Sequence, residues 1–168
     1  MSMKSMLAAE AKIEPVKTGL DAKARQKISS QLVAVLADTY TLLVKTHVYH
    51  WNVVGPLFLP LHQLTEQHYQ DLFEATDVIA ERIRALGHTT PVSFDQMLPK
   101  ADVVEEKGTQ SAGAMIKQLI ADHEKITQKL REVALNADDV DDLVTADMLT
   151  ARLTVHEKAI WMLRAIDS

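Results

Sequence analysis

Residues 47–87 read HVYHWNVVGPLFLPLHQLTEQHYQDLFEATDVIAERIRALG and decide the fold. Two helical patterns meet here, and Gly55-Pro56 separates them, because proline has no amide hydrogen and cannot continue the first helix. The second pattern, from about Pro60 to Leu86, ends at Gly87, a residue type common just after helix ends. The stretch therefore predicts a helical hairpin.

Helical patterns continue on both sides of this hairpin. Its first helix is predicted to begin after Asp21, an N-cap residue type, and to run to about Val54. The long connection at residues 88–109 contains two prolines and a glycine, and Phe94–Leu98 predicts a short helix inside it. The remaining segments are a third helix from Ser111 to about Leu135, an acidic turn at Asn136–Asp142, and a fourth helix from about Val144 to Ile166.

Four long helices with one long connection predict an all-α chain, a four-helix bundle of the ferritin-like plan. The chain has 168 residues, which suits one domain. Residues 1–20 lack helical periodicity and contain Pro15 and Gly19, so they are predicted to form a flexible N-terminal tail. Residues 21–168 are predicted to form the domain.

Composition narrows the chemistry. The chain has no cysteine, which excludes disulfides, thiol nucleophiles and thiolate metal sites, so any metal must be held by histidine and carboxylate side chains. The formal net charge of −5 does not indicate a folded nucleic-acid-binding surface. No apolar run reaches the roughly 18–20 residues that span a bilayer, and no signal-peptide core is present. No membrane association and a cytoplasmic location are therefore expected.

Candidate metal ligands are dense in the hairpin. His50 ends its first helix, and the second helix carries two pairs of residues at i,i+4 spacing, His62 with Glu66 and Asp77 with Glu81. Side chains four residues apart lie above one another on a helix, and all four fall within an arc of about 100°. A single such pair is usually surface decoration, so a solvated helix face remains the alternative to a metal site.

The two pairs cannot share one site within a subunit. Glu66 and Asp77 are eleven residues apart, about 16 Å along a helix, whereas metal–ligand bonds are about 2 Å long. Antiparallel pairing of two copies about a two-fold axis would bring the first pair of one copy to the second pair of the other, and it would make two such sites. The spacing therefore predicts a metal site between subunits.

At these residues the sequence resembles the Dps family, the DNA-binding proteins from starved cells, also called mini-ferritins. The resemblance rests on Tyr49-His50-Trp51-Asn52-Val53, Gly55-Pro56, Phe58, His62, Asp77, Ala80-Glu81-Arg82-Ile83 and Leu86-Gly87. The four-helix plan and the His156-Glu157-Lys158 to Trp161-Met162-Leu163 segment extend it over roughly residues 21–166.

The resemblance implies a homo-dodecameric cage that stores iron and protects against oxidative stress. Its substrates would be ferrous iron and hydrogen peroxide, the latter preferred over oxygen, with at most two irons per ferroxidase site and no organic cofactor. The implied ligands are His50, His62 and Glu66 of one subunit with Asp77 and Glu81 of its mate. The family often has Asp where this chain has Glu66, so the second iron position is expected to differ in affinity.

The resemblance also suggests roles for residues outside the ligand set. Trp51 would trap stray oxidising equivalents, with ordinary interface packing as the alternative. Asp142 and Asp147 are candidates for acidic pores that draw in ferrous ions, with a solvated turn as the alternative. Among the other histidines, His47 is expected to lie behind the ligands without binding metal or to be exposed. His68 is expected on the surface, and His88, His123 and His156 are expected to be structural or exposed.

The tail departs from DNA-binding members of the family. Phosphate neutralisation needs positive charge, and Glu10 and Glu14 offset most of Lys4, Lys12 and Lys17, the candidate DNA-binding residues. DNA is therefore a weakly supported partner. A nucleoid-compacting cage and a helical oligomer with a defunct metal face remain the competing hypotheses, although the intact set of five ligands argues against the latter.

Overall fold

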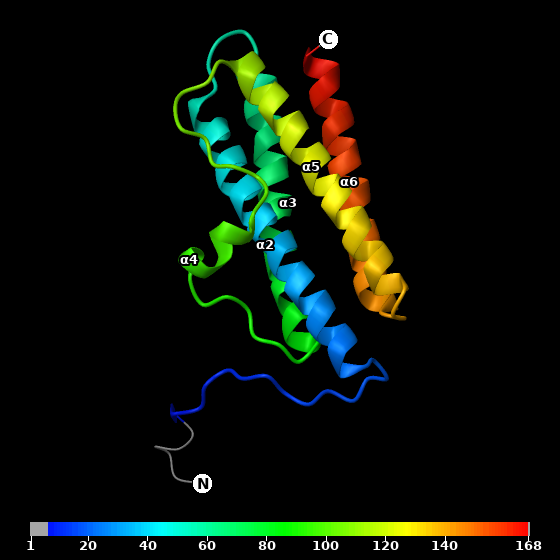
Figure 1. Ribbon diagram of the computed structural model, residues 1–168. Helices are drawn as coiled ribbons and strands as arrows, with labels where there is room; N and C mark the ends of the chain where they lie inside the picture. Colours follow the sequence, from blue (N-terminus) through cyan, green and yellow to red (C-terminus); the bar gives the residue numbers. More distant parts are fainter. Residues whose placement is uncertain (1–6, 168) are drawn as a thin grey trace.

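The computed structural model describes residues 7–167, and its helices form a four-helix bundle (Figure 1). No helix in this part of the chain is long and apolar enough to cross a membrane. The helices are α2 (Ala22–Asn52), α3 (Phe58–Ala85), α4 (Phe94–Met97), the 3-10 turn η1 (Leu98–Lys100), α5 (Ala112–Asp138) and α6 (Leu143–Asp167). The predicted all-α, ferritin-like architecture with a short helix in the long connection is confirmed.

The bundle consists of two antiparallel hairpins, α2 with α3 and α5 with α6 (Figure 1). The connection after α3 returns along the outside of α2 and carries α4 before it enters α5. It therefore crosses the length of the bundle, so that α5 runs parallel to α3. The hairpins meet mainly where α2 packs on α5, whereas α3 and α6 make fewer close backbone approaches.

Side-chain capping explains why the starts of α2 and α5 were predicted to within one residue. The Asp21 side chain accepts hydrogen bonds from the amides of Lys23 and Ala24 at 2.7 and 3.2 Å, and the Ser111 hydroxyl accepts one from Ala114 at 3.2 Å. Each bond satisfies an amide that has no partner inside the helix.

The start of α3 differs from the prediction. The helix begins at Phe58 and not at Pro60, because proline is tolerated in the first helical turn, where no intrahelical donor is needed.

The α5–α6 turn is shorter than predicted. Helix α5 continues to Asp138, so the expected turn at Asn136–Asp142 is wrong over its first three residues. Ala137 is fully buried, which gives the last helical turn a core contact. The chain then reverses at Asp141, whose φ of 60° is left-handed, and the Asp142 amide donates to the Ala137 carbonyl at 2.8 Å. This is the pattern of a helix C-cap.

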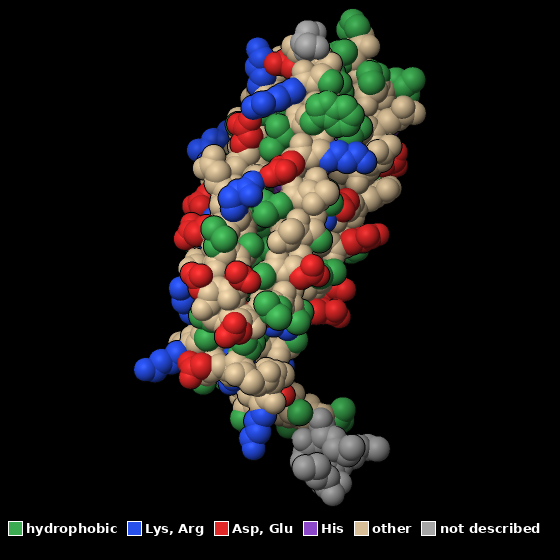
Figure 2. Space-filling model, turned by 90° about the vertical axis from the view of Figure 1, so that its right-hand side faces the viewer, with side chains coloured by type: hydrophobic (Ala, Val, Ile, Leu, Met, Phe, Trp, Pro, Cys, Tyr) green, Lys and Arg blue, Asp and Glu red, His purple; other side chains and the backbone are tan. Residues whose placement is uncertain are grey.

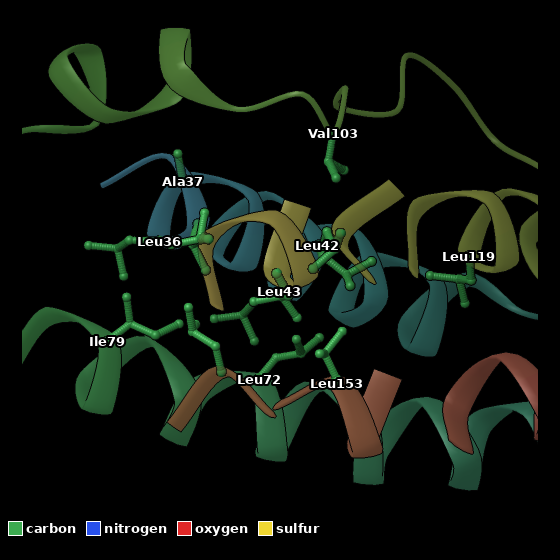
Figure 3. Packing of buried hydrophobic residues seen from close by; sticks show 14 of the residues in the cluster. Leu36, Ala37, Leu42, Leu43, Leu72, Ile79, Val103, Leu119 and Leu153 are labelled. Carbon is green, nitrogen blue, oxygen red and sulfur yellow. The ribbon is translucent and has the colours of Figure 1, made fainter. Parts of the chain in front are cut away.

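The core joins all four long helices and the connection (Figure 3). Leu36 and Leu43 of α2 lie near Ile79 and Leu72 of α3, while Val103 of the connection covers α2 from outside. The Asp38 carboxylate holds this cover in place, because its Oδ1 accepts hydrogen bonds from the amides of Asp102 and Val103 at 2.6 and 2.8 Å. The connection is thus anchored although it has little regular structure.

The described part of the tail lies against the end of α3. The Glu14 amide donates to the Gly87 carbonyl at 2.9 Å, and a Glu14 carboxylate oxygen lies 3.8 Å from Arg84. A Cβ atom at Gly87 would stand 2.6 Å from the Glu14 carbonyl oxygen, and φ there is +89°. Glycine is therefore required by both the turn and the close approach. The predicted flexibility of residues 1–20 stays a prediction, and residues 1–6 lie outside the described part.

A buried ion pair links α2 to α5. Lys45 Nζ lies 2.6 Å from an Asp122 carboxylate oxygen, and both side chains are at most 3% exposed. Gln118 donates a second hydrogen bond to Asp122 at 3.0 Å. Because desolvation cancels much of the attraction in such a pair, its main effect appears when one partner is removed.

We therefore expect Asp122→Ala to destabilise the fold by about 3–5 kcal/mol, since it leaves the Lys45 ammonium buried without a counter-charge. The double variant Lys45→Met/Asp122→Leu should lie much closer to the wild type, because it buries no charge. Urea unfolding followed by far-UV circular dichroism compares the three proteins. Equal stability of the single and double variants would contradict this account of the pair.

Candidate metal centre

Two histidines meet across the α2–α3 turn. His50, on the last turn of α2, and His62, on the second turn of α3, stack with ring centroids 3.8 Å apart and planes tilted by 17°. His50 is 8% exposed and His62 is half-buried. Phe58 stacks on the outer side of His62 at 5.0 Å. The hairpin turn thus brings together two residues that are twelve positions apart.

Each ring is fixed by the backbone of the other. His50 Nδ1 lies 2.9 Å from the His62 carbonyl oxygen, and His62 Nδ1 lies 2.9 Å from the His50 carbonyl oxygen. A carbonyl oxygen can only accept, so both rings must carry their hydrogen on Nδ1. The lone pair of each neutral imidazole is then on Nε2. Metal-binding histidines are commonly oriented in this way by a hydrogen bond from the other ring nitrogen.

Three carboxylates lie on α3 outside the bundle core. Asp77 and Glu81 are exposed, and Glu66 is half-buried one turn after His62. Within the described residues none of the three has an ion pair or a side-chain hydrogen bond, whereas the bundle carboxylates Asp38, Asp71, Asp122 and Asp142 are each paired with a lysine or an arginine. Unpaired carboxylates on one helix face are available as ligands for a cation.

One described chain brings only part of the predicted ligand set together. His50, His62 and Glu66 lie at one end of α3, while Asp77 and Glu81 lie about 16 Å or more further along the same helix. Within residues 7–167, no group of three or more histidine or carboxylate side chains is placed to hold one metal ion. The five ligands therefore form two half-sites on a common face.

An aromatic stack borders the histidine pair. The His47 ring lies between Trp51 and Tyr69, with both centroids 4.1 Å away, and Tyr69 also meets His50 edge-on at 5.2 Å. His47 is thus in the layer behind His50, and its partial burial, with the neighbouring His50, lowers its pKa. The role of Tyr69 was missed by sequence reasoning, although its i+3 spacing from Glu66 pointed to the same side of α3.

The stack opens onto an apolar groove between α2 and α3. The groove has a volume of about 560 Å³, and Leu43, Val44 and Phe73 form part of its lining. Trp51 is 63% exposed and Phe73 is 64% exposed. The face that carries the half-sites is therefore also the face where large apolar side chains remain uncovered.

The pore candidates differ from each other. Asp142 is buried, and its carboxylate accepts hydrogen bonds from Arg82 at 2.6 Å and from the Thr145 hydroxyl at 2.6 Å. It therefore ties the end of α3 to the start of α6. Asp147 is exposed on α6. A pore role for either residue stays a prediction, as does a DNA-binding role for Lys12 and Lys17, and Lys4 lies outside the described residues.

Three other histidines lie inside the bundle. His123 and His156 are each 2% exposed. The expectation of a surface position for His68 is wrong, because this residue is half-buried and its Nδ1 is shielded from solvent. The signal was present in the sequence, since His68 lies four residues from both Leu64 and Leu72 and thus shares their core-facing side of α3.

Comparison with known proteins agrees with the geometry. Residues 29–168 match the family of the ferritin-like domain. The chain is 44% identical over 152 residues to a low temperature-induced protein of Nostoc, covering 89% of this chain and 85% of that protein. It is 37% identical over 140 residues to the DNA protection during starvation protein of Brevibacillus brevis, covering 80% of this chain and 94% of the relative.

Solved structures give the same result. The Dps protein from Bacillus brevis superposes with a TM-score of 0.84 at 33% identity, covering 91% of this chain and all of that one. The Dps protein from Vibrio cholerae, described as a member of a broad superfamily of ferritin-like diiron-carboxylate proteins, superposes with a TM-score of 0.87 at 28% identity, covering 95% of this chain and 100% of that one. With its helical plan and its family match over residues 29–168, the chain belongs to the Dps family of ferritin-like proteins.

Proposed function

We propose that this protein is a mini-ferritin that oxidises ferrous iron between two-fold-related subunits, preferably with hydrogen peroxide, and stores the ferric product in a dodecameric cage. Iron is the substrate and the cargo of this reaction. The ligands would be His50, His62 and Glu66 of one subunit with Asp77 and Glu81 of its mate.

The observation that carries the proposal is the orientation of the histidine pair. Both Nδ1 atoms are engaged by backbone carbonyls, so each Nε2 has a free lone pair. These lone pairs lie in the ring planes. Because the planes are tilted by only 17° and the centroids are 3.8 Å apart, they cannot converge on one ion about 2 Å away. His50 and His62 therefore suit two neighbouring iron positions.

A second subunit would supply what one chain lacks. An isologous contact of the α2–α3 faces would bring Asp77 and Glu81 of each subunit to the histidine pair of the other. The same contact would cover Trp51, Phe73 and the apolar groove, whose exposure is unfavourable in an isolated chain. Burial of the groove and completion of the site would thus be one event.

These ligand types suit the reaction. Each ferrous ion gives up one electron and hydrogen peroxide accepts two, so two ferrous ions and one peroxide yield two ferric ions and two hydroxide ions as the O–O bond breaks. The carboxylates offset the charge that iron gains, and imidazole suits iron in both oxidation states. Consumption of both reactants at one site would limit hydroxyl-radical formation and so protect against oxidative stress.

We expect His62→Ala/Asp77→Ala to lower the rate of peroxide-driven iron oxidation by an order of magnitude or more, since loss of even outer-shell partners of a metal site typically costs about 10- to 100-fold. The measurement is ferric absorbance after hydrogen peroxide is added anaerobically to ferrous iron and protein. Repeating it with oxygen compares the two oxidants.

A matched control is His88→Ala/Glu132→Gln, which removes a histidine and a carboxylate that lie outside the half-sites. It should oxidise iron at the wild-type rate. If the wild type were no faster than iron in buffer alone, the ferroxidase proposal would be wrong. If the double variant kept the wild-type rate, the ligand assignment would be wrong.

Nucleoid binding is the second candidate function, favoured by the name of the Brevibacillus relative, a DNA protection during starvation protein. The surface gives it little support. Figure 2 shows acidic and basic side chains interspersed over the α5–α6 face without a continuous basic stripe. In the tail, the contacts of Glu14 with Gly87 and Arg84 hold the chain against its own subunit.

We therefore expect the full-length protein not to retard linear duplex DNA in gels at low ionic strength, because the tail has almost no net positive charge. The variant Glu10→Lys/Glu14→Lys removes two negative charges from each tail and adds two positive ones, which raises the net charge of the tail by four, and it should retard DNA in a salt-sensitive way. Retardation by the wild type itself would contradict this expectation and favour the nucleoid-binding function.

A further inference from the structure

The interior of the α5–α6 hairpin contains a histidine pair that the proposed iron chemistry does not use. His123 of α5 and His156 of α6 are each 2% exposed, and their Nδ1 atoms lie 2.9 Å apart. The ring centroids are 5.0 Å apart. Neither residue is near the ligand set in the sequence, so the pair needs its own explanation.

The hydrogen bond fixes how many protons the pair can hold. One Nδ1 must donate and the other must accept, so the pair cannot carry a hydrogen on both Nδ1 atoms. His123 Nε2 is buried without a hydrogen-bond partner among the described residues. At this position an unprotonated nitrogen costs less than an N–H group without an acceptor. The Nδ1 hydrogen therefore belongs to His123, and the accepting lone pair belongs to His156.

Both positions for an additional proton are unfavourable. A proton on His123 Nε2 would be a buried donor with no acceptor, which costs more than a lost hydrogen bond. A proton on His156 Nδ1 would point two N–H groups at each other across 2.9 Å. The pair therefore fits together only when both rings are neutral.

The charged groups around the pair do not stabilise an additional proton on either ring. From α3, His68 meets His123 edge-on at 5.6 Å, and Asp71 is already paired with Arg152 of α6 through two hydrogen bonds of 3.0 and 2.6 Å. The Arg152 guanidinium adds positive charge beside both rings, and Lys158 of α6 adds it on the His68 side. No carboxylate among the described residues bonds to either ring of the pair.

We propose that the His123–His156 pair stabilises the α5–α6 hairpin in an acid-sensitive way. The pair holds the two helices together when both rings are neutral, and protonation of the rings separates them when the medium becomes acidic. This device concerns the stability of the subunit and is independent of the ferroxidase proposal.

The direction of the pH dependence follows from the burial of the rings. Burial lowers the pKa of His156 from the usual 6.5 to about 3, and burial with the neighbouring His156 also lowers that of His123. In the unfolded chain both rings take up protons near pH 6.5, whereas the folded chain takes them up only in stronger acid. The contribution of the pair to the free energy of unfolding is therefore fully present above pH 6.5, and it is lost as the pH drops below that value.

The test is urea unfolding of the assembled protein between pH 7.5 and 4.5. If the pair excludes both protons, the wild type takes up two more protons per subunit on unfolding than His123→Gln/His156→Gln does. Below about pH 5.5, where both rings of the unfolded chain are protonated, each further unit of fall in pH then raises the unfolding equilibrium constant roughly 100-fold more in the wild type than in the double variant. The control His88→Gln, which changes a histidine outside the bundle core, should keep the wild-type slope.

A second measurement covers the case in which the double variant does not fold. Deuterium exchange at the imidazole C2 position, followed by mass spectrometry of the wild-type protein, reports the titration of individual histidines. His123 and His156 should titrate well below pH 6.5. Titration of both near pH 6.5, or equal unfolding slopes for the wild type and the double variant, would overturn the proposal.

Discussion

A straight helix keeps its ends apart, and this constraint determines how the protein can act. Helix α3 carries four of the five candidate ligands on one face, yet Glu66 and Asp77 are separated by about 16 Å along its axis. No adjustment of side chains within one subunit closes such a distance. If the five residues bind iron together, the protein must act as an assembly, and burial of the apolar groove beside the histidine pair would favour that assembly.

The rest of the fold keeps α2 and α3 in register. The reciprocal hydrogen bonds between His50 and His62 span the hairpin turn, the Asp142–Arg82 pair ties the far end of α3 to α6, and Asp38 holds the long connection over α2. Polar contacts thus lie at the ends and seams of the bundle, where they set geometry, while apolar packing fills its centre. The His123–His156 and Lys45–Asp122 pairs are exceptions, since each places two titratable groups inside the bundle.

Much of this could be predicted from the sequence because it depends on local signals. Caps, proline, glycine and apolar periodicity located the helices to within a few residues, and i,i+4 spacing identified the half-sites. Contacts between distant segments were not predictable in this way. Nothing local reveals that Asp142 pairs with Arg82, or that Tyr69 stacks on His47. His68 was misplaced because it was judged by its position two residues beyond Glu66, on another side of the helix, and not by its spacing from Leu64 and Leu72, with which the fold buries it.

The most direct test of a site shared between subunits is complementation between two inactive variants. His62→Ala and Asp77→Ala subunits would be unfolded, mixed in equal amounts and reassembled, and ferrous oxidation by peroxide would be measured. In a mixed pair, one of the two sites combines the intact histidines of one subunit with the intact carboxylates of the other. With random pairing about one quarter of all sites is intact, so roughly a quarter of the activity of identically treated wild type should return. No recovery above the separate variants, in a mixture shown to have exchanged subunits, would contradict the shared site.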